Sequence, residues 1–281
     1  MSEPRTSGTG ELAQVTRTAR LDVALVEAGL QPSRTRAAKA VAAGRVRVDG
    51  RPTTKASETV REGIELELSA DAADRWVGRA AHKLLGALET FPLPVAGKVA
   101  LDAGASTGGF TQVLLEAGAS HVISVDVGHD QLHPVLVADP RVENREGFNL
   151  RQLRSEDVPG GVDLIVGDLS FISLRLLVAP LSSVLRPDGD ALLMVKPQFE
   201  VGRERLARTG VVTDPRARRD AVSTVVDAAE RAGLVALGVG RSQLAGQDGN
   251  AEFFLHLVPA ARPNMPHIPA RGSLLDTVDY G

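Results

Sequence analysis

The chain has 281 residues, 43% of them hydrophobic, no cysteine and a formal net charge of −3 at pH 7. This length suffices for a full α/β core and a second small module, while the lack of cysteine excludes a disulfide framework and thiolate metal sites. The net charge gives no sign of nucleic-acid binding by the whole protein, so any basic surface must be local. Because no apolar run approaches the roughly 18 residues of a membrane span, and residues 1–10 are too polar for a secretory signal, we expect a soluble cytoplasmic protein.

Composition and periodicity divide the chain into five stretches. The first residues are rich in Ser, Thr and Gly with almost nothing to bury, and the last stretch is interrupted by prolines, so both ends predict disorder. We expect a disordered lead over residues 1–16, a small α+β module over 17–70, a linker over 71–80, a large α/β domain over 81–260 and a disordered tail over 261–281.

The small module predicts two helices and a hairpin. Apolar residues recur at helical spacing from Leu21 and end at Gly29, a plausible residue after a helix C-cap. Ser33 suits the N-cap of a second helix, which Gly44 would stop. Residues 45–50 then alternate polar and apolar side chains into an Asp-Gly turn, which is typical of a β-hairpin.

This module carries a local excess of positive charge. Between Arg17 and Arg61 the sequence has ten basic residues against four acidic ones. Arg34 would start the second helix, and Arg45 and Arg47 would share one face of the first hairpin strand, so their head groups could reach one phosphate ridge. A solvated basic face with no ligand is the other interpretation.

From Lys98 onward the pattern predicts a doubly wound, largely parallel sheet. Short apolar runs alternate with segments of helical length. Two late runs separated by a polar, Gly-rich loop predict a hairpin at the far edge. In this architecture ligands bind at the carboxyl ends of the parallel strands. The runs are Val99–Leu101, Val122–Val125, Leu164–Val166, Ala191–Val195, Leu234–Val239 and Glu252–Val258.

The first of these strands leads into a Gly-rich turn, Asp102–Phe110, whose glycines permit close backbone approach to a ligand. Ser106 stands where the dinucleotide fingerprint requires Gly, and no Lys-Ser or Lys-Thr pair follows to make a P-loop. Asp126 ends the second strand and suits a ribose diol, so the pair favours a nucleoside cofactor over a purely structural turn. Asn149, after the third strand, could bind an adenine edge or serve as an ordinary loop asparagine.

Four polar residues are expected to meet at the same edge. Asp168 and Lys196 end the fourth and fifth strands, and Glu252 begins the last one, which places it at that edge if the strand runs antiparallel. Lys83, on the helix before the first strand, could reach over the site. Each has an ordinary explanation as a surface or strand-end residue, but four at one edge favour a functional cluster.

Several segments together resemble a known family. The C-terminal ones are Gly104–Phe110, Asp168–Ser173, Val195–Glu200, Gly210–Val212 and Gly249–Phe254, and the N-terminal ones are Arg20–Asp22, Ser33–Arg34 and Gly44–Gly50. The C-terminal segments look like the TlyA family, whose members, sometimes named haemolysins, are S-adenosylmethionine-dependent 2′-O-ribose methyltransferases of ribosomal RNA with a class I, Rossmann-like fold. The N-terminal segments resemble the alpha-L RNA-binding motif of a small-subunit ribosomal protein.

The resemblance assigns roles to residues and suggests cytidine in ribosomal RNA as the target, with RNA or ribosomal subunits as partner and no obligate protein partner. It implies a catalytic tetrad of Lys83, Asp168, Lys196 and Glu252. Together with the Gly-rich turn, it implies an S-adenosylmethionine site made of Asp102, Gly104, Ala105, Ser106, Thr107, Gly108, Gly109, Phe110, Asp126, Asn149 and Asp168. The implied RNA contacts are Arg20, Arg34, Arg45, Arg47 and Lys55. No persuasive metal-ligand spacing links the histidines at 82, 121, 129 and 133.

Two departures from the family pattern lie in the connector, where the sequence reads Asp74-Arg75-Trp76-Val77 and where Ala80 replaces a glycine. They bear on coupling between the domains more than on chemistry. Two other classes of function stay open: an RNA-binding assembly factor without turnover, and a pore-forming haemolysin, which the lack of a spanning segment disfavours.

Methyl transfer to a ribose hydroxyl requires alignment and loss of a proton. Lys196 is the candidate either to take that proton or to remain cationic and stabilise the alkoxide. We expect Asp168 to orient Lys196, Lys83 to tune the field and Glu252 to fix the geometry.

Overall fold

The computed structural model describes residues 11–31, 33–69, 75–202, 206, 209–265 and 267–281. The chain forms two compact units that divide between Arg75 and Trp76, and each is described by itself. Residues 71–74 of the expected linker lie outside the described residues. No helix in the described part of the chain is long and apolar enough to cross a bilayer.

In the described part of the N-terminal unit, two helices pack on a four-stranded sheet of order β1-β6-β3-β4, with a separate two-stranded pair, β2 and β5. A core of apolar side chains, among them Leu21, Leu25 and Val41, fills the unit. The elements are β1 (Glu11–Gln14), β2 (Ala19–Arg20), α1 (Leu21–Glu27), α2 (Arg34–Ala42), β3 (Val46–Val48), β4 (Arg51–Thr53), β5 (Thr59–Val60) and β6 (Glu65–Leu68).

Local signals account for these elements, and the predicted order of helix, turn, helix and hairpin is confirmed. Gly29 and Gly44 follow the two helices with φ of +74° and +71°, a backbone conformation in which glycine is unstrained. Ser33 caps α2 by accepting a hydrogen bond from the Arg36 amide at 3.3 Å. Asp49 and Gly50 both have positive φ between the paired strands β3 and β4, as a two-residue hairpin turn requires.

The disordered lead predicted over residues 1–16 includes residues that are folded. Strand β1 pairs antiparallel with β6, and Val15 is only 4% exposed in the core of the unit. The prediction is therefore wrong for residues 11–16, while residues 1–10 lie outside the described residues. An edge strand is held by backbone hydrogen bonds, so a short polar sequence carries little signal of its pairing.

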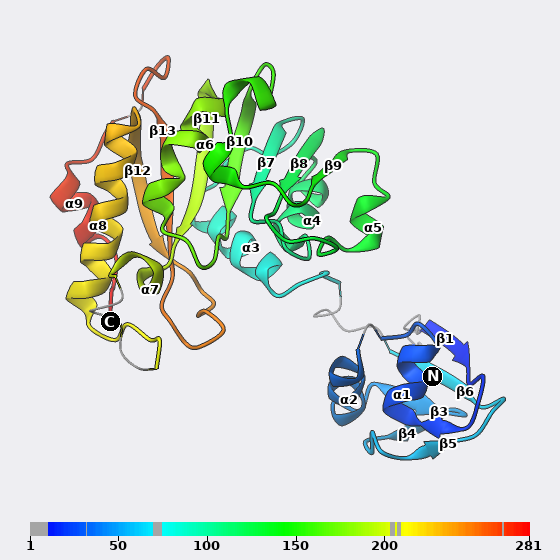
Figure 1. Ribbon diagram of the computed structural model, residues 1–281. Coiled ribbons are helices and arrows are strands. Elements are labelled where there is room, and N and C mark those ends of the chain that lie inside the picture. The colour runs from blue at the N-terminus through cyan, green and yellow to red at the C-terminus, as the bar shows by residue number, and fades with distance from the viewer. Residues whose placement is uncertain (1–10, 32, 70–74, 203–205, 207–208, 266) are drawn as a thin grey trace, which may run out of the picture. The chain divides into compact units, whose positions relative to one another are not determined.

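The C-terminal unit is built on a seven-stranded sheet of order β12-β13-β11-β10-β7-β8-β9 (Figure 1). Its strands are β7 (Val99–Ala103), β8 (His121–Val125), β9 (Val142–Arg145), β10 (Val162–Gly167), β11 (Leu185–Val195), β12 (Leu234–Arg241) and β13 (Phe253–Pro259). Its helices are α3 (Ala80–Thr90), α4 (Gly109–Glu116), α5 (Pro134–Val137), α6 (Val178–Val184), α7 (Pro197–Glu200), α8 (Pro215–Arg231) and α9 (Arg271–Asp276), with short 3₁₀ turns η1 (Leu150–Gln152), η2 (Ser155–Asp157) and η3 (Leu174–Leu176).

The predicted doubly wound architecture is confirmed. Strands β9, β8, β7, β10 and β11 pair in parallel, whereas β13 runs antiparallel between β11 and β12. The late hairpin thus forms the far edge, with β12 outermost. Reversal of β13 brings the start of this strand to the edge where its neighbour β11 ends.

Alternating side chains give the sheet a separate apolar core on each face. Phe253 and Leu255 join the core beneath α6, α8 and α9, whereas Phe254 joins the core beneath α3 and α4. Both faces of a central parallel sheet are thereby covered, which explains the nearly continuous apolar runs. The sheet is consequently a rigid support for residues at its carboxyl edge.

The expected disordered tail over 261–281 is wrong for the part that folds back on the sheet. It contains α9, and Leu274, Leu275 and Tyr280 are 4%, 3% and 7% exposed in the core beneath α8. Arg219 of α8 also pairs with Asp276 at 2.8 Å. The adjacent Leu274 and Leu275, with Tyr280 after the helix, bury enough apolar surface to hold this segment on the core.

Candidate active site

The four polar residues predicted to converge do so at the carboxyl edge of the sheet. Asp168 directly follows β10 and Lys196 directly follows β11, which are parallel neighbours. Glu252 directly precedes the antiparallel β13, and Lys83 reaches the same place from α3. Strand direction explains why residues spread over 170 positions of sequence meet, since parallel strands end and an antiparallel strand begins at one edge.

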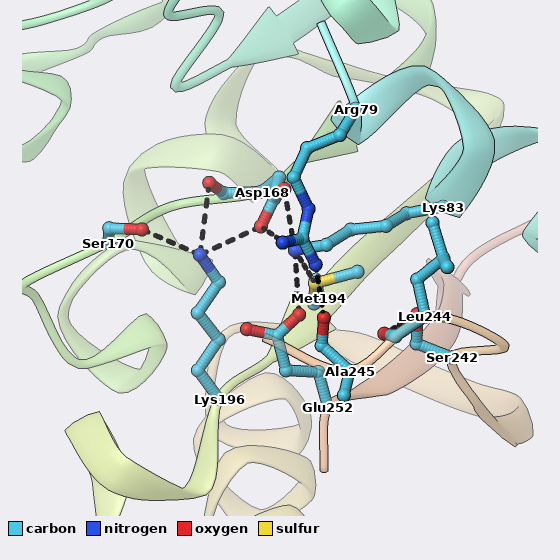
Figure 2. Close-up of polar contacts among 10 residues, drawn as sticks. All are labelled: Arg79, Lys83, Asp168, Ser170, Met194, Lys196, Ser242, Leu244, Ala245 and Glu252. Atoms are coloured by element: carbon cyan, nitrogen blue, oxygen red, sulfur yellow. Dashed lines mark hydrogen bonds and ion pairs between the residues drawn. The ribbon is translucent and has the colours of Figure 1, made fainter. Parts of the chain in front are cut away.

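Their side chains form a continuous ion-pair network (Figure 2), here called the tetrad. Lys196 Nζ lies 2.8 Å from Asp168 Oδ1, and Lys83 Nζ lies 3.1 Å from Asp168 Oδ2. Lys83 Nζ also lies 2.7 Å from Glu252 Oε2, as an ion pair whose angles are outside those of a hydrogen bond. The side chains of Lys83, Lys196 and Glu252 are 7%, 8% and 3% exposed, so the network is largely desolvated.

Two cations and two anions leave the tetrad neutral in its usual ionisation states. Burial alone would raise the pKa of Asp168, but the charges of Lys196 and Lys83 outweigh burial and lower this pKa below its ordinary value. The Asp168 carboxylate therefore stays ionised across the physiological pH range and keeps both lysines oriented.

Lys196 has a second neighbour that sequence reasoning missed. Its Nζ donates to Ser170 Oγ at 2.6 Å, and it also lies 6.0 Å from the ring centre of Phe199. Ser170 belongs to the loop after β10, in the same Asp-Leu-Ser-Phe-Ile-Ser segment as Asp168. The position of Ser170 two residues after the strand-end Asp168 was the sequence signal that could have indicated it.

The tetrad borders a cavity of about 830 Å³. Residues 104–107 and Phe110 of the Gly-rich turn line this cavity, together with residues of the segments after β10 and β11. A volume of this size accommodates a nucleoside-sized ligand together with a second group. Tetrad residues at the wall are thus placed where two ligands could meet.

The Gly-rich turn presents backbone to the cavity. Gly104 and Gly108 have φ of +83° and +93°, and Ser106 also has a positive φ of +48°. A Cβ at Gly104 would lie 3.2 Å from Leu169 Cδ2, so a side chain there would crowd the loop of Asp168. Helix α4 begins immediately after the turn, with Gly108 as its N-cap. The predicted turn is therefore a cradle of small residues ahead of a helix N-terminus.

Asp126 lies beside the turn but does not line the cavity wall. Its Oδ2 accepts a hydrogen bond from the Ser106 amide at 2.8 Å, and its Oδ1 accepts one from the Gly128 amide at 2.8 Å. The exposed Asn149 instead caps η1 by accepting a bond from the Arg151 amide at 3.0 Å. The predicted contacts of Asp126 and Asn149 with a cofactor remain predictions.

Asp102 lies in the interior rather than at the cavity. It is 1% exposed, its Oδ2 accepts a hydrogen bond from Thr111 Oγ1 at 2.7 Å, and its Oδ1 has no partner among the described residues. Burial raises the pKa of Asp102 to about 7, although Thr111 opposes the shift. The side chain therefore fixes the base of the turn against α4 and does not itself reach the cavity.

We expect this buried carboxyl to make folding stability depend on pH. Unfolded Asp102 ionises near its ordinary pKa of about 3.9, whereas the folded group holds its proton up to about pH 7. Between these values the native state binds more protons, so its contribution to the free energy of unfolding falls by up to about 1.4 kcal/mol per pH unit. Urea unfolding at pH 5 and pH 8 should show a smaller decrease in the free energy of unfolding for Asp102→Asn than for the wild type. An equal decrease in both proteins would contradict the role assigned to Asp102.

Two further residues, Phe171 in the cavity wall and Glu200, which follows the wall residue Phe199 in the sequence, are absent from the predicted site. Phe171 lines the cavity with 91% of its surface exposed and a positive φ of +63°, which is a strained conformation for a residue with a Cβ. Glu200 is 6% exposed and accepts hydrogen bonds from Ser173 Oγ and the Leu174 amide, both at 2.6 Å. It thereby ties the loop that carries Asp168 and Phe171 to α7.

The five predicted RNA contacts lie on the N-terminal unit. Arg20, Arg34, Arg47 and Lys55 are exposed and Arg45 is half-buried. Arg20 and Arg34 both donate to Asp22, which is 4% exposed, at distances of 3.0 to 3.3 Å. The hydrogen bond from Arg20, helped by Arg34, lowers the pKa of Asp22 to about 2 against the effect of its burial. Asp22 therefore holds two exposed guanidinium groups side by side.

Known proteins share both the sequence and the fold. The FtsJ-like methyltransferase family matches residues 76–258, and the S4 domain matches residues 19–66. The 16S/23S rRNA (cytidine-2′-O)-methyltransferase TlyA of Mycobacterium tuberculosis is 48% identical over 241 residues, which cover 86% of this chain and 90% of that protein. The 23S rRNA (cytidine-2′-O)-methyltransferase TlyA of Campylobacter jejuni is 34% identical over 198 residues, which cover 70% of this chain and 75% of that protein.

A solved structure from Streptococcus thermophilus, of a protein named as a hemolysin, superposes with a TM-score of 0.69 at 35% identity. It covers 93% of this chain and 96% of its own. The family matches fall on both units, and the match over residues 76–258 includes all four tetrad residues. The chain belongs to the TlyA family of FtsJ-like methyltransferases.

Proposed function

We propose that this protein transfers a methyl group from S-adenosylmethionine to the 2′-hydroxyl of a cytidine in ribosomal RNA. The observation that carries the proposal is the buried Lys-Asp-Lys-Glu tetrad beside a small-residue turn, in a chain 48% identical to an rRNA (cytidine-2′-O)-methyltransferase. An S4 domain in the same chain supplies a second surface for RNA. The intact ribosomal subunit is the expected form of the substrate.

The residues of the cavity fit the methyl donor. Gly104, Ala105, Ser106 and Thr107 line it with backbone and small side chains at the start of α4, where a ligand with polar ends can approach closely. When bound, S-adenosylmethionine supplies an electrophilic methyl group on a sulfonium. The neighbouring Asp126 suits the ribose diol of the donor, because its carboxylate is held at the turn by two backbone amides.

Lys196 is placed to act on the hydroxyl that attacks. Its Nζ lies at the cavity wall and is aimed by Asp168 and Ser170. As a neutral amine it would take the hydroxyl proton, and as an ammonium it would stabilise the alkoxide. Lys83 and Glu252 set the field around this group without extra net charge, since they form a pair of opposite sign.

Phe171 is the candidate contact for the target nucleotide. This residue is 91% exposed, lines the cavity, and stands beside Phe199, another lining residue, with a centroid separation of 5.4 Å. RNA bases that leave a helix commonly stack on aromatic side chains. A base on Phe171 would place its own ribose near the tetrad end of the same cavity.

Arg34→Ala should weaken RNA binding through the phosphate backbone. Each lost phosphate contact is expected to reduce the magnitude of the slope of log affinity against log salt by roughly 0.7 to 0.9. The matched control is Arg36→Ala, an exposed arginine on the same helix that lies outside the predicted RNA-contacting set. Filter binding of rRNA at several salt concentrations measures the slope, and equal slopes for the two variants would contradict the assignment.

Two other functions are distinguished by a labelling experiment and a vesicle-leakage assay. Purified protein is incubated with ribosomal subunits and methyl-labelled S-adenosylmethionine, and the labelled nucleotide is mapped. A ribose methyltransferase labels a 2′-oxygen, whereas an assembly factor binds rRNA without labelling it. A pore-forming protein would release dye from lipid vesicles without either result.

A further inference from the structure

One wall of the cavity has no place in the proposed chemistry. It is the segment of residues 209–212 between α7 and α8, in which Gly210 lines the cavity. The Gly-Val-Val sequence at 210–212 is among the family-like segments, yet none of its side chains is polar. Its contribution must therefore come from where its backbone lies.

Asn250 fixes this backbone to the tetrad. Its Oδ1 accepts a hydrogen bond from the Val212 amide at 2.9 Å, and its Nδ2 donates to the Gly210 carbonyl at 2.9 Å. Asn250 is 2% exposed and stands two residues before Glu252. Both ends of one buried amide thus join the wall to the strand start that carries a tetrad member.

Arg218 binds the carbonyl of Val212, the residue whose amide Asn250 binds. Its Nε donates to the Val212 carbonyl at 2.7 Å, and its Nη1 donates to the Tyr280 carbonyl at 2.8 Å. The Tyr280 ring, in turn, packs on Phe253, the first residue of β13, with a centroid separation of 5.0 Å. The wall, the segment around Tyr280 and the start of β13 therefore form one connected frame.

Burial of the Arg218 side chain removes a charged group from water, which disfavours folding. Arg218 is 8% exposed, and its partners among the described residues are carbonyl oxygens rather than carboxylates. Asp214 and Asp279 attract this charge by coulombic interaction, and Arg241 repels it. Taking the guanidinium out of water still has a cost that an apolar residue would avoid. What only a guanidinium provides is two donors in a rigid fork that spaces two backbone carbonyls.

We propose that Arg218 and Asn250 are positioning residues for the RNA side of the methyl-transfer site, an inference that rests on the proposed function. The Gly-rich turn follows β7, which is two strands away from β11, whereas the wall attaches through α8 and the start of β13. Displacement of the wall therefore alters how the ribose meets Lys196 and leaves the cofactor cradle intact. A misplacement of about 1 Å at a reacting group can reduce rate by about 100-fold.

The test compares Arg218→Lys with Arg219→Ala. Lysine keeps the charge but has one ammonium group in place of the fork, so it cannot hold both carbonyls in the same geometry. Arg219 is the matched control, because it is the adjacent arginine on α8 and contacts Asp276 of α9 instead of the wall. Both variants are assayed well below their unfolding temperatures for kcat and KM with ribosomal subunits, for the Kd of S-adenosylmethionine by calorimetry, and for hydrogen exchange of the Val212 amide.

We expect Arg218→Lys to lower kcat/KM for rRNA by about 10- to 100-fold, to leave the cofactor Kd unchanged and to speed exchange at Val212, while Arg219→Ala changes none of these. The proposal is overturned if Arg218→Lys matches the control in rate or in Val212 exchange, or if the cofactor Kd weakens in parallel with the rate, as a general loss of structure would produce. A wild-type protein that labels no rRNA overturns the proposed function itself, whereas unchanged Val212 exchange in an active protein overturns only the role of Arg218.

Discussion

Lys196→Met is expected to abolish most methyl transfer while the protein stays folded and binds S-adenosylmethionine normally. The substitution removes the Nζ amine, which lies 2.8 Å from Asp168 Oδ1 and 2.6 Å from Ser170 Oγ and is held by them at the cavity wall. Loss of a general base or of one charge-stabilising donor typically costs about 10²- to 10⁴-fold in rate. Single-turnover transfer of labelled methyl groups to ribosomal subunits measures the loss directly.

Lys98→Met is the matched control for the removal of a partly buried, ion-paired lysine. Lys98 pairs with the buried Asp190 at 3.2 Å and immediately precedes β7, at the edge of the sheet opposite to the tetrad. It should lose stability but keep its kcat. Equal activity losses in the two variants would show that destabilisation, and not chemistry, explains the effect at position 196.

Lys196→Arg separates the two roles of the amine. A guanidinium stays charged throughout the accessible pH range, so it cannot accept the hydroxyl proton but can still stabilise an alkoxide. Partial activity in this variant would indicate the electrostatic role. Activity as low as that of Lys196→Met would indicate proton removal.

The sequence predicted the tetrad because its members stand next to strand ends, where pattern and geometry are tightly linked. Asp168 and Lys196 follow apolar runs that could only be buried strands, and Glu252 required one further inference, the reversal of β13. The sequence did not predict which of the four side chains contact one another. Lys83 bridges Asp168 and Glu252, a relation that depends on the path of α3 over the sheet.

The two wrong predictions have a common physical cause. The lead was expected to be disordered because it has almost nothing to bury, yet β1 pairs with β6 and Val15 lies in the core. The tail was expected to be disordered because prolines interrupt its sequence, although Leu274 and Leu275 pack against the core. In both places the outcome depended on contacts with segments distant in sequence, and local composition does not contain that information.

Lys83→Met and Glu252→Gln should each destabilise the protein strongly, and together they should destabilise it less than the sum of the two. The two groups lie 2.7 Å apart with side chains only 7% and 3% exposed. Removing one partner of a buried pair leaves an uncompensated charge and typically costs about 3–5 kcal/mol, whereas replacing both can be nearly neutral. Urea unfolding of the wild type, both single variants and the double variant gives the coupling free energy.

Charge balance explains why this coupling is expected to be large. Lys83→Met leaves Asp168 and Glu252 with Lys196 alone, and Glu252→Gln leaves two lysines with Asp168 alone. The double variant returns to one cation and one anion, the directly paired Lys196 and Asp168. Additive losses would mean that the cluster is hydrated enough for each charge to act independently. A double variant that folds stably yet transfers no methyl group would show that Lys83 and Glu252 serve the reaction, since an uncharged pair would then serve the fold as well.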